Sequence, residues 1–447
     1  MKLFGTDGLR AVAGEFPLDS ATVELLGRLL FALLKEKKLV TEVIIGQDTR
    51  ESSDQLFASL TKGFCDAGGR IDRAGVLSTP ALAFLAKKEG MCAVAITASH
   101  NPYRDNGIKI FGPDGYKMSE ESESWIEPYL LGEKKFGGSK NGPGSGENRE
   151  MQQHFFNEYC TYLRTELFPD LDLSGIRVVI DCANGAVFQL APDVLRSLGA
   201  DVTAINNHPD GRNINQNCGA LYPEVLFEKV QEDGYDCGFT FDGDGDRCLA
   251  ADSGGIYDGD FILAASARYL QEQGKLNGNS VVATPMSNMG LEVFLQKHDI
   301  RLLRVPVGDK NVLDMLKRES LSLGGEQSGH IIFMNDTFIG DGLITALQLL
   351  RMYKRARTPF GRLCDGFIKF PQILLNIPVI RKPDLNNIPE IADGIKNAEQ
   401  KLSGTGRILV RYSGTEMLAR IMIEGPDQTL IDSMARQLGE IIQSKLN

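Results

Sequence analysis

Three aspartates, Asp242, Asp244 and Asp246, alternate with glycines in one short segment of the sequence. They follow the apolar residues Cys237 to Phe241, which we expect to form a buried strand. A looped backbone lets carboxylates at this spacing converge, and their mutual repulsion calls for a hard divalent cation. With three protein carboxylates, Mg²⁺ would need a further oxygen ligand, such as a phosphate oxygen. The alternative is a solvated acidic turn, whereas an EF-hand is excluded because Arg247 stands where that loop needs glycine.

Ser99 lies in a second polar loop, Thr97 to Pro102, which follows the apolar residues Ala93 to Ile96. The loop does not match the GxSxG pattern of a nucleophile-elbow hydrolase. An Asn-Pro turn capped by a serine is the simpler alternative. Because this loop occupies the same place in its segment as the aspartate loop does in the next, we interpret Ser99 as a phosphoryl carrier. Its phosphate could supply the missing metal ligand.

Three basic side chains in or near such loops could move a proton or hold a phosphate. Lys109 ends the segment Asp105-Asn106-Gly107-Ile108-Lys109, His100 follows the serine, and His330 closes the loop Gly325 to His330. A lysine can act as a point charge or a proton donor, and a histidine can do either near neutral pH. The alternatives are an ordinary surface lysine and structural histidines.

Two more loops carry groups that suit a phosphorylated sugar. The carboxylate of Glu326 and the hydroxyl of Ser328 could bind paired ring hydroxyls, although a turn cap explains them equally well. The segment Arg411 to Glu416 combines an arginine, two hydroxyls and backbone N–H groups around a glycine. That combination can form an anion nest for a phosphate, and a plain hairpin turn is the alternative.

The elements that must position these loops repeat three times along the chain. Each repeat has an apolar strand entering a polar loop, an amphipathic helix, a second strand and a third strand. The first strands begin near Val43, Val178 and Val281, and the second strands are expected at Arg70 to Leu77, Ala200 to Ile205 and Ile300 to Val305. The third strands lead into the loops of Ser99, Asp242 and Glu326. Because ligand sites of parallel sheets lie at the carboxyl ends of strands, the three loops could line one cleft.

Downstream of Pro371 the pattern changes to a strand–loop–strand unit and a closing helix over Gln428 to Ser444, which indicates a smaller α+β domain. Between Gly132 and Asn148 the sequence is rich in Gly, Ser, Asn and Pro, and we expect an exposed loop. The 447 residues alone suggest roughly three domains. The triplication together with the C-terminal unit raises the expected number to four.

Composition excludes several classes of protein. With 48 Lys plus Arg against 59 Asp plus Glu, the net charge of −11 argues against a nucleic-acid partner or a polybasic membrane contact. The 8 cysteines are scattered without a CxxC pair, which argues against a zinc framework and favours reduced thiols. No apolar run reaches the roughly 18 residues of a membrane span. We therefore expect a cytoplasmic protein.

Taken together, these loops resemble those of the α-D-phosphohexomutase family, and the resemblance runs from end to end. The motifs that carry it are, in order, Gly5 to Arg10, Thr97 to Pro102, Asp242 to Arg247, Gly325 to His330 and Arg411 to Glu416. Within the family, the opening Phe4-Gly5-Thr6-Asp7-Gly8 and the Gly325 to His330 loop look most like the bacterial branch that acts on glucosamine phosphate.

The resemblance implies an α/β fold with three successive mixed-sheet domains of similar topology and a smaller C-terminal α+β domain around a central cleft. The corresponding ranges are 1–155 with the phosphoserine loop, 156–254 with the metal loop, 255–369 with the sugar loop, and 370–447 for phosphate binding. Such a protein acts on a small-molecule hexosamine phosphate, as a monomer or a homodimer.

The resemblance also implies a reaction, an isomerisation by intramolecular phosphotransfer. Glucosamine 6-phosphate and glucosamine 1-phosphate interconvert through a sugar 1,6-bisphosphate, on the way to amino-sugar nucleotides and cell-wall precursors. Ser99 would be phosphorylated, and one Mg²⁺ per chain would be held by that phosphate with Asp242, Asp244 and Asp246. The bisphosphate would also serve as activator. The same machinery would serve a phosphoglucomutase or phosphomannomutase, and a catalytically silent sugar-phosphate-binding relative is a further alternative.

Roles carried over from the family fall into three groups. Arg10 and Lys109 would stabilise charge near the serine, with Lys109, His100 or His330 as candidates for proton transfer. The residues expected around the sugar are Arg247, Gly308, Glu326 and Ser328. Those expected to grip the phosphate that does not react are Arg411, Ser413, Gly414, Thr415 and Arg420.

Overall fold

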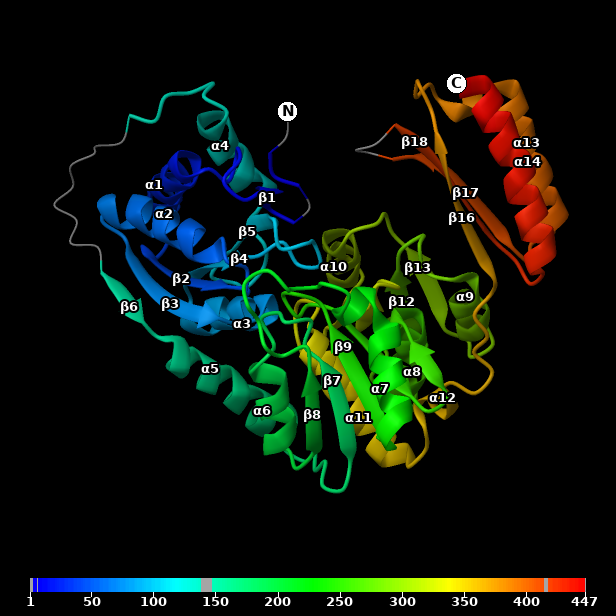
Figure 1. The fold of residues 1–447 in the computed structure, drawn as a ribbon, viewed down its shortest axis with the longest axis horizontal. Coiled ribbons are helices and arrows are strands. Elements are labelled where there is room, and N and C mark those ends of the chain that lie inside the picture. The colour runs from blue at the N-terminus through cyan, green and yellow to red at the C-terminus, as the bar shows by residue number, and fades with distance from the viewer. Residues whose placement is uncertain (1–2, 6, 138–146, 414–416, 447) are drawn as a thin grey trace. The chain divides into compact units, whose positions relative to one another are not determined.

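The computed structural model of the chain describes residues 3–5, 7–137, 147–413 and 417–446. The chain divides into two compact units (Figure 1). The larger contains Met1–Thr284 and Leu303–Asp365, and the smaller contains Pro285–Leu302 and Gly366–Asn447. The smaller unit is therefore built from two separate stretches of sequence.

The first sheet of the larger unit has six strands in the order β1-β5-β4-β2-β3-β6. Its strands are β1 (Leu9–Val12), β2 (Glu42–Gln47), β3 (Arg70–Val76), β4 (Cys92–Ile96), β5 (Asp105–Phe111) and β6 (Asn148–Glu150). Its helices are α1 (Ser20–Glu36), α2 (Ser53–Asp66), α3 (Thr79–Glu89) and α4 (Glu120–Leu130). Helices α1 and α2 pack so closely that a Cβ at Gly63 would lie only 1.9 Å from the carbonyl oxygen of Glu24.

The second sheet has five strands in the order β11-β10-β9-β7-β8. Its strands are β7 (Arg177–Asp181), β8 (Asp201–Ile205), β9 (Cys237–Phe241), β10 (Cys248–Asp252) and β11 (Gly255–Tyr257). The helices of this region are α5 (Gln152–Thr161), α6 (Leu190–Ser197) and α7 (Pro223–Asp233). Strand β9 has the bounds that the apolar pattern predicts.

The third sheet has four strands in the order β13-β12-β14-β15. Its strands are β12 (Ser280–Ala283), β13 (Arg301–Arg304), β14 (Leu323–Gly325) and β15 (Ile331–Phe333). The helices along this stretch of sequence are α8 (Gly259–Glu272), α9 (Met289–Gln296), α10 (Asp309–Arg318), α11 (Gly342–Ala356) and α12 (Phe360–Leu363). Helix α9 belongs to the smaller unit and the others to the larger.

One arrangement recurs in all three sheets. The first strand of each repeat lies between the second and the third, in the orders β3-β2-β4, β8-β7-β9 and β13-β12-β14. The first and third strands run parallel, and a fourth strand, β5, β10 or β15, pairs antiparallel with the third. The fold class predicted from the triplicated pattern is confirmed. The loops of Ser99, Asp242 and Glu326 each join the third strand to the fourth, at the carboxyl end of a parallel strand.

The smaller unit contains a three-stranded antiparallel sheet in the order β16-β18-β17. Its elements are β16 (Gln372–Pro378), α13 (Pro389–Leu402), β17 (Arg407–Tyr412), β18 (Leu418–Glu424) and α14 (Gln428–Leu446). Helices α13 and α14 cover one face of the sheet (Figure 1), and their apolar residues form a separate core with Ile421 and Ile423. The α+β character expected of the C-terminal region is confirmed, with the closing helix two residues longer than predicted.

Two other expectations meet the structure only in part. Asn148, placed in a loop by its composition, begins the short strand β6, which pairs parallel with β3. Much of that expected loop, residues 138–146, lies outside the described residues. No helix in the described part of the chain has the length and apolar character of a membrane span.

Candidate active site

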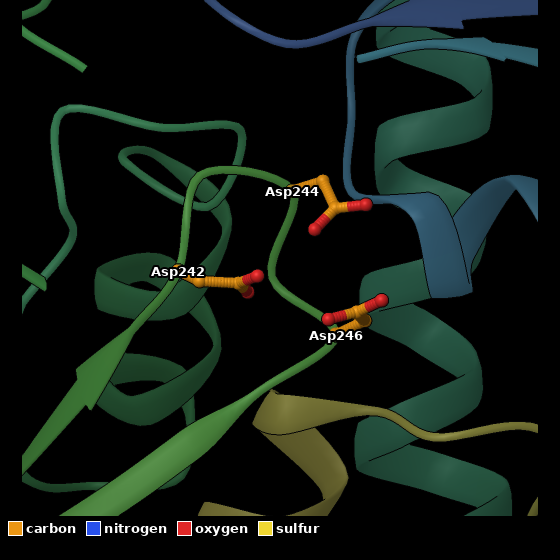
Figure 2. A group of neighbouring side chains, drawn as sticks. All are labelled: Asp242, Asp244 and Asp246. Atoms are coloured by element: carbon orange, nitrogen blue, oxygen red, sulfur yellow. The ribbon is translucent and has the colours of Figure 1, made fainter. Parts of the chain in front are cut away.

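The aspartate loop joins β9 to β10 and brings its three carboxylates together. One oxygen from each of Asp242, Asp244 and Asp246 lies within 4.8 Å of the others (Figure 2). Gly245 has φ of +75°, a left-handed conformation that favours glycine. A Cβ at Gly243 would lie 2.5 Å from the carbonyl oxygen of Ser99. The glycines therefore allow both the turn of this loop and its close approach to the serine.

The three carboxylates are buried and only partly neutralised by the protein. Lys109 Nζ lies 2.8 Å from Asp244 Oδ2 and 3.8 Å from Asp246 Oδ2. Burial and the charges of Asp246 and Asp244 raise the pKa of Asp242 well above its usual range. Asp244 Oδ1 and Asp246 Oδ1 are buried and have no hydrogen-bond partner among the described residues. Uncompensated carboxylate oxygens in one cluster fit a hard divalent cation, so the residues present suit Mg²⁺.

Ser99 lies in the loop between β4 and β5 and faces this cluster. Its Oγ donates a hydrogen bond to Asp242 Oδ2 at 2.7 Å and lies 3.2 Å from His100 Nδ1. The side chain is buried, and the residue has φ of +53°, which is uncommon for any residue except glycine. The structure thus brings together the serine and the metal loop, which are 143 residues apart in sequence.

The three candidates for proton transfer have different electrostatic surroundings. Burial acts to lower the pKa of Lys109, but neighbouring carboxylates, Asp244 first among them, outweigh it and raise that pKa. Burial, reinforced by the charges of Arg247 and Arg10, lowers the pKa of His100 to about 4. Burial also acts to lower the pKa of His330, but Asp246 raises it to about 9. Around these aspartates, Lys109 and His330 therefore favour the charged form and His100 the neutral form.

Arg10, on β1, is the first of a series of ion-paired side chains that continues through Asp7 and Lys117. Its Nη2 lies 3.0 Å from Asp7 Oδ2, and Lys117 Nζ donates to Asp7 Oδ1 at 2.6 Å and to Asp309 Oδ2 at 2.5 Å. Burial acts to raise the pKa of Asp7, but Lys109, Lys117 and Arg10 hold it below its usual range. Asp7 thus orients the predicted Arg10.

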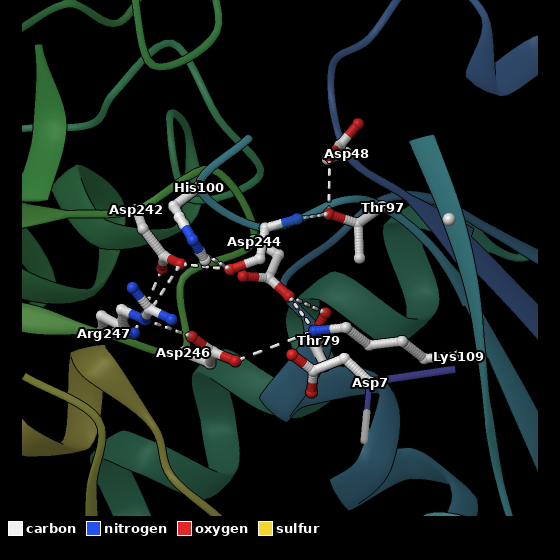
Figure 3. Close-up of polar contacts among 12 residues, drawn as sticks. Asp7, Asp48, Thr79, Thr97, His100, Lys109, Asp242, Asp244, Asp246 and Arg247 are labelled. Atoms are coloured by element: carbon white, nitrogen blue, oxygen red, sulfur yellow. Dashed lines mark hydrogen bonds and ion pairs between the residues drawn. The ribbon is translucent and has the colours of Figure 1, made fainter. Parts of the chain in front are cut away.

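The third loop, between β14 and β15, gathers the residues expected around the sugar. Glu326 Oε1 accepts a hydrogen bond from the backbone N–H of Gly308 at 3.1 Å. Ser328 Oγ is buried and has no hydrogen-bond partner among the described residues. Arg247 Nε lies 3.9 Å from Asp242 Oδ2 and from Asp246 Oδ1 (Figure 3). The sugar loop and the metal loop are joined where the Cys248 N–H donates to the carbonyl oxygen of Gly329.

A cavity of about 620 Å³ opens beside these groups within the larger unit. Its lining includes Thr79, Lys109, Asp246 and His330 of the site. Tyr116, Lys117 and Asp309 also line it. A cavity of this size with convergent polar groups is large enough for a small sugar phosphate.

The residues expected to bind the distal phosphate, the one that does not react, belong to the smaller unit. Arg411 and Arg420 are register partners on β17 and β18, so their side chains start from the same face of the sheet. Ser413 is buried, and its carbonyl oxygen accepts from Lys382 Nζ at 2.6 Å. Gly414 and Thr415 lie outside the described residues. The role of this group in phosphate binding stays a prediction.

Sequence reasoning missed several residues that hold the site in place. Thr79 begins α3 and binds the metal loop twice, through its hydroxyl to Asp244 Oδ2 at 2.8 Å and through its N–H to the Asp244 carbonyl oxygen at 3.0 Å. Arg50, next to Asp48 in the loop after β2, contacts the serine loop, as does Asn215. The signal that could have found Asp48 and Arg50 is their place at the carboxyl end of a first strand.

Models of four domains of one family match nearly the whole chain. Those of phosphoglucomutase/phosphomannomutase alpha/beta/alpha domains I, II and III match residues 1–136, 157–255 and 258–370, and that of the C-terminal domain matches residues 374–441. Curated relatives named phosphoglucosamine mutase include one from Desulforamulus reducens, 44% identical with 98% of this chain and 100% of that protein covered. Another, from Koribacter versatilis, is 43% identical over 100% of this chain and 97% of that protein.

Solved structures show the same fold at lower sequence identity. A phosphoglucomutase/phosphomannomutase family protein from Burkholderia thailandensis superposes with a TM-score of 0.80 at 22% identity, covering 100% of this chain and 98% of that one. Aspergillus fumigatus N-acetylphosphoglucosamine mutase, solved with GlcNAc-6P and magnesium, gives a TM-score of 0.68 at 18% identity, covering 100% and 96%. Since the four domain models and the full-length relatives agree, the chain belongs to the phosphoglucomutase/phosphomannomutase family, the α-D-phosphohexomutases.

Proposed function

We propose that the protein is a phosphoglucosamine mutase, which interconverts glucosamine 6-phosphate and glucosamine 1-phosphate through a phosphoserine and a bisphosphate. The observation that carries the chemistry is the Ser99 hydroxyl, 2.7 Å from a carboxylate of the three-aspartate cluster. The choice of an amino sugar is supported by full-length relatives of that name at 40–44% identity.

Ser99 acts as the phosphoryl carrier in both halves of the reaction. In the first, the bond between phosphorus and Ser99 Oγ breaks while a bond forms to the free C1 hydroxyl of glucosamine 6-phosphate. The hydroxyl proton leaves to a base, and Ser99 Oγ regains a proton. After the bisphosphate turns round, its 6-phosphoryl group passes to Ser99 Oγ and glucosamine 1-phosphate departs. Positioning and charge neutralisation dominate such a transfer.

The basic residues around Ser99 supply much of that neutralisation. Lys109 contacts Asp244 of the cluster and Arg247 lies beside Asp242. Arg10 is paired with Asp7. Lys109, His100 and His330 are the candidates for moving the proton at the reacting oxygen. Asp242, Asp244 and Asp246, together with a phosphate oxygen on Ser99, would hold one Mg²⁺. When bound, Mg²⁺ neutralises charge on the transferring phosphoryl group.

Substrate contacts follow the loops described above. Glu326 and Ser328 hold the ring hydroxyls in either orientation of the bisphosphate, and Arg247 and Gly308 are the other residues expected around the sugar. The distal phosphate is bound by Arg411, Ser413, Gly414, Thr415 and Arg420. Support comes from the register of β17 and β18, which places these two arginines opposite each other, an arrangement suited to binding one anion.

We infer that the four domains span 1–155, 156–254, 255–369 and 370–447, in keeping with the three sheets and the C-terminal α+β unit. The substrate is a small hexosamine phosphate, with a sugar 1,6-bisphosphate as activator and a monomer or homodimer as the working form. A reducing, cytoplasmic setting is supported by the 8 cysteines, none of which forms a disulfide within the described residues.

The alternative is a phosphoglucomutase or phosphomannomutase with the same mechanism, the two activities for which the matching family is named. Coupled assays with Mg²⁺ and bisphosphate, comparing the 1-phosphates of glucosamine, glucose and mannose, separate the two. We expect glucosamine 1-phosphate to give the highest kcat/KM. A clear preference for mannose 1-phosphate would overturn the amino-sugar assignment while leaving the phosphoserine chemistry in place.

The phosphoserine itself is tested by Ser99→Ala. We expect this variant to keep the wild-type melting temperature and lose nearly all turnover, because it deletes the carrier oxygen without opening a large cavity. Intact-mass analysis after incubation with bisphosphate should find phosphate on wild-type Ser99 and none on the variant. Substantial turnover by a folded Ser99→Ala protein would contradict the mechanism and would favour direct transfer between sugars.

A further inference from the structure

One buried arginine, Arg50, forms hydrogen bonds to the backbone of the serine loop. Arg50 is 2% exposed, and its Nε lies 2.9 Å from Asp48 Oδ2. Its two terminal nitrogens donate to four carbonyl oxygens, those of Ser99, Asn101 and Pro102 in the serine loop and that of Asp105 at the start of β5. All three nitrogens of the guanidinium thereby donate hydrogen bonds, Nε to the carboxylate of Asp48 and the two terminal nitrogens to one backbone segment.

The same network fixes both backbone polar groups of the reacting residue. The N–H of Ser99 donates to Thr97 Oγ1 at 2.9 Å, and the Thr97 hydroxyl donates in turn to Asp48 Oδ2 at 2.6 Å (Figure 3). The carbonyl oxygen of Ser99 accepts from Arg50 Nη2 at 3.0 Å and from Asn215 Nδ2 at 2.9 Å. Asp48 thus joins the group on the N–H side to the group on the carbonyl side.

Asp48, Arg50 and Thr97 together form a clamp on Ser99, whose backbone conformation is otherwise unfavourable. Ser99 has φ of +53°, and a non-glycine residue in that region persists only when its surroundings over-determine it. The conformation decides where Cβ, and therefore Oγ, points. With the metal loop pressed against the Ser99 carbonyl at Gly243, the left-handed turn leaves Oγ 2.7 Å from Asp242 Oδ2.

We propose that Asp48, Arg50 and Thr97 are positioning residues for phosphoryl transfer, which hold Ser99 in its left-handed conformation and so aim its Oγ at the metal-binding carboxylates. The inference rests on the proposed function, because it assumes that Ser99 carries the phosphoryl group. A buried ion pair whose arginine also donates to one backbone segment is weak evidence for stability and better evidence for a geometric role. The carrier must return to the same geometry in both half-reactions, so a loosened clamp slows each of them.

Thr97→Val tests the clamp, because it replaces the hydroxyl by a methyl group and leaves the side-chain volume nearly unchanged. The valine cannot accept the Ser99 N–H or donate to Asp48, so we expect kcat to fall about 100-fold, the scale of a 1 Å misplacement. KM for glucosamine 1-phosphate should stay near the wild-type value, because no sugar contact is touched. Thr97→Ser keeps the hydroxyl and should restore most of the lost kcat, which a purely packing role of the methyl group would not allow.

A matched control removes a comparable hydrogen bond elsewhere in the same sheet domain. The Thr22 hydroxyl donates to Asp19 Oδ2 at 2.7 Å at the start of α1. Thr22→Val should lower the melting temperature without changing kcat. Single-turnover transfer of phosphate from loaded Ser99 to glucosamine 6-phosphate, followed by intact mass, separates slow transfer from a smaller folded fraction.

The outcomes distinguish the clamp from the function on which it rests. Wild-type turnover by Thr97→Val, or a kcat loss no greater than its folded fraction explains, would overturn the clamp. Inactive wild type or active Ser99→Ala would instead remove the proposed function. If Thr97→Val does not fold, Arg50→Lys takes its place, since one ammonium keeps the charge beside Asp48 but cannot reach four carbonyls. A folded Arg50→Lys protein with wild-type single-turnover rate would likewise refute the clamp.

Discussion

At the scale of single residues, the site is a balance of buried charge. Three carboxylates face Lys109 and Arg247, and two of their oxygens have no hydrogen-bond partner in the described part of the chain. Lys109 is 2% exposed and reaches both Asp244 and Asp246. Removing one partner of a buried ion pair leaves the other charge uncompensated, which costs far more than the pair contributes.

We expect Lys109→Met to lower the free energy of unfolding by about 3–5 kcal/mol in EDTA, because two buried carboxylates lose their cation. Added Mg²⁺ should return part of that loss, since it binds the same carboxylates. Denaturant unfolding with and without Mg²⁺ measures both effects. The exposed Lys62, which pairs with Glu24, supplies the control Lys62→Met, expected to change stability by less than about 0.5 kcal/mol. Equal losses in the two variants would refute the charge-balance argument.

At the scale of elements, Lys117 links three segments that carry site residues. It lies between β5 and α4 and pairs with Asp7, just before β1, and with Asp309, the first residue of α10. Asp7 orients Arg10, and Asp309 follows Gly308, whose backbone N–H donates to Glu326. A carboxylate in the first turn of α10 is also favoured by the helix dipole. The segment that leads into β1 and the segment that begins α10 therefore share one lysine.

We expect Lys117→Met to slow turnover by an amount equivalent to about 0.5–2 kcal/mol, because Asp7 and Asp309 lose their common cation and Arg10 loses its fixed partner. Lys117→Arg keeps the charge and should recover most of the rate. Steady-state kinetics with both phosphosugars, alongside melting temperatures, measures the effect. Loss of rate in Lys117→Arg equal to that in Lys117→Met would show that shape rather than charge is required.

At the scale of the whole molecule, the smaller unit is assembled from two stretches of sequence by a buried carboxylate. Glu424 is fully buried and accepts from Arg407 Nε at 2.6 Å, from Asn288 Nδ2 at 3.3 Å and from the Met289 N–H at 3.2 Å. It ties residues at the start of α9 to β17 and β18, more than a hundred positions away in sequence. The unit therefore depends on a group that its local sequence pattern does not mark.

We expect Glu424→Ala to destabilise the smaller unit by about 3–5 kcal/mol, because the guanidinium of Arg407 loses its buried partner. Calorimetry should then show an early transition while the larger unit unfolds at its usual temperature. The control is Glu390→Ala, whose carboxylate pairs with Lys445 at the surface, and it should leave both transitions unchanged. A single unshifted transition in Glu424→Ala would contradict this account.

Much of the architecture could be predicted because its signals are local. The apolar runs ending in polar loops marked the strands, and three equivalent positions in a repeated pattern marked the loops of Ser99, Asp242 and Glu326. The pattern missed the start of β6 at Asn148 because that strand forms only by pairing with β3. It also missed Lys117, whose partners Asp7 and Asp309 are distant in sequence.

The sequence by itself determined which side chains can do chemistry and in which order the elements follow, because both depend on residue type and short-range spacing. Only the tertiary structure decided what holds those side chains in place. Arg50 reaches the Ser99 carbonyl across 49 residues, Asn215 across 116, and Lys109 reaches Asp244 across 135. Hydrogen bonds over such separations leave no periodicity for a sequence pattern to reveal. They exist because folding the sheets of the larger unit brings the carboxyl ends of three parallel strands to one place.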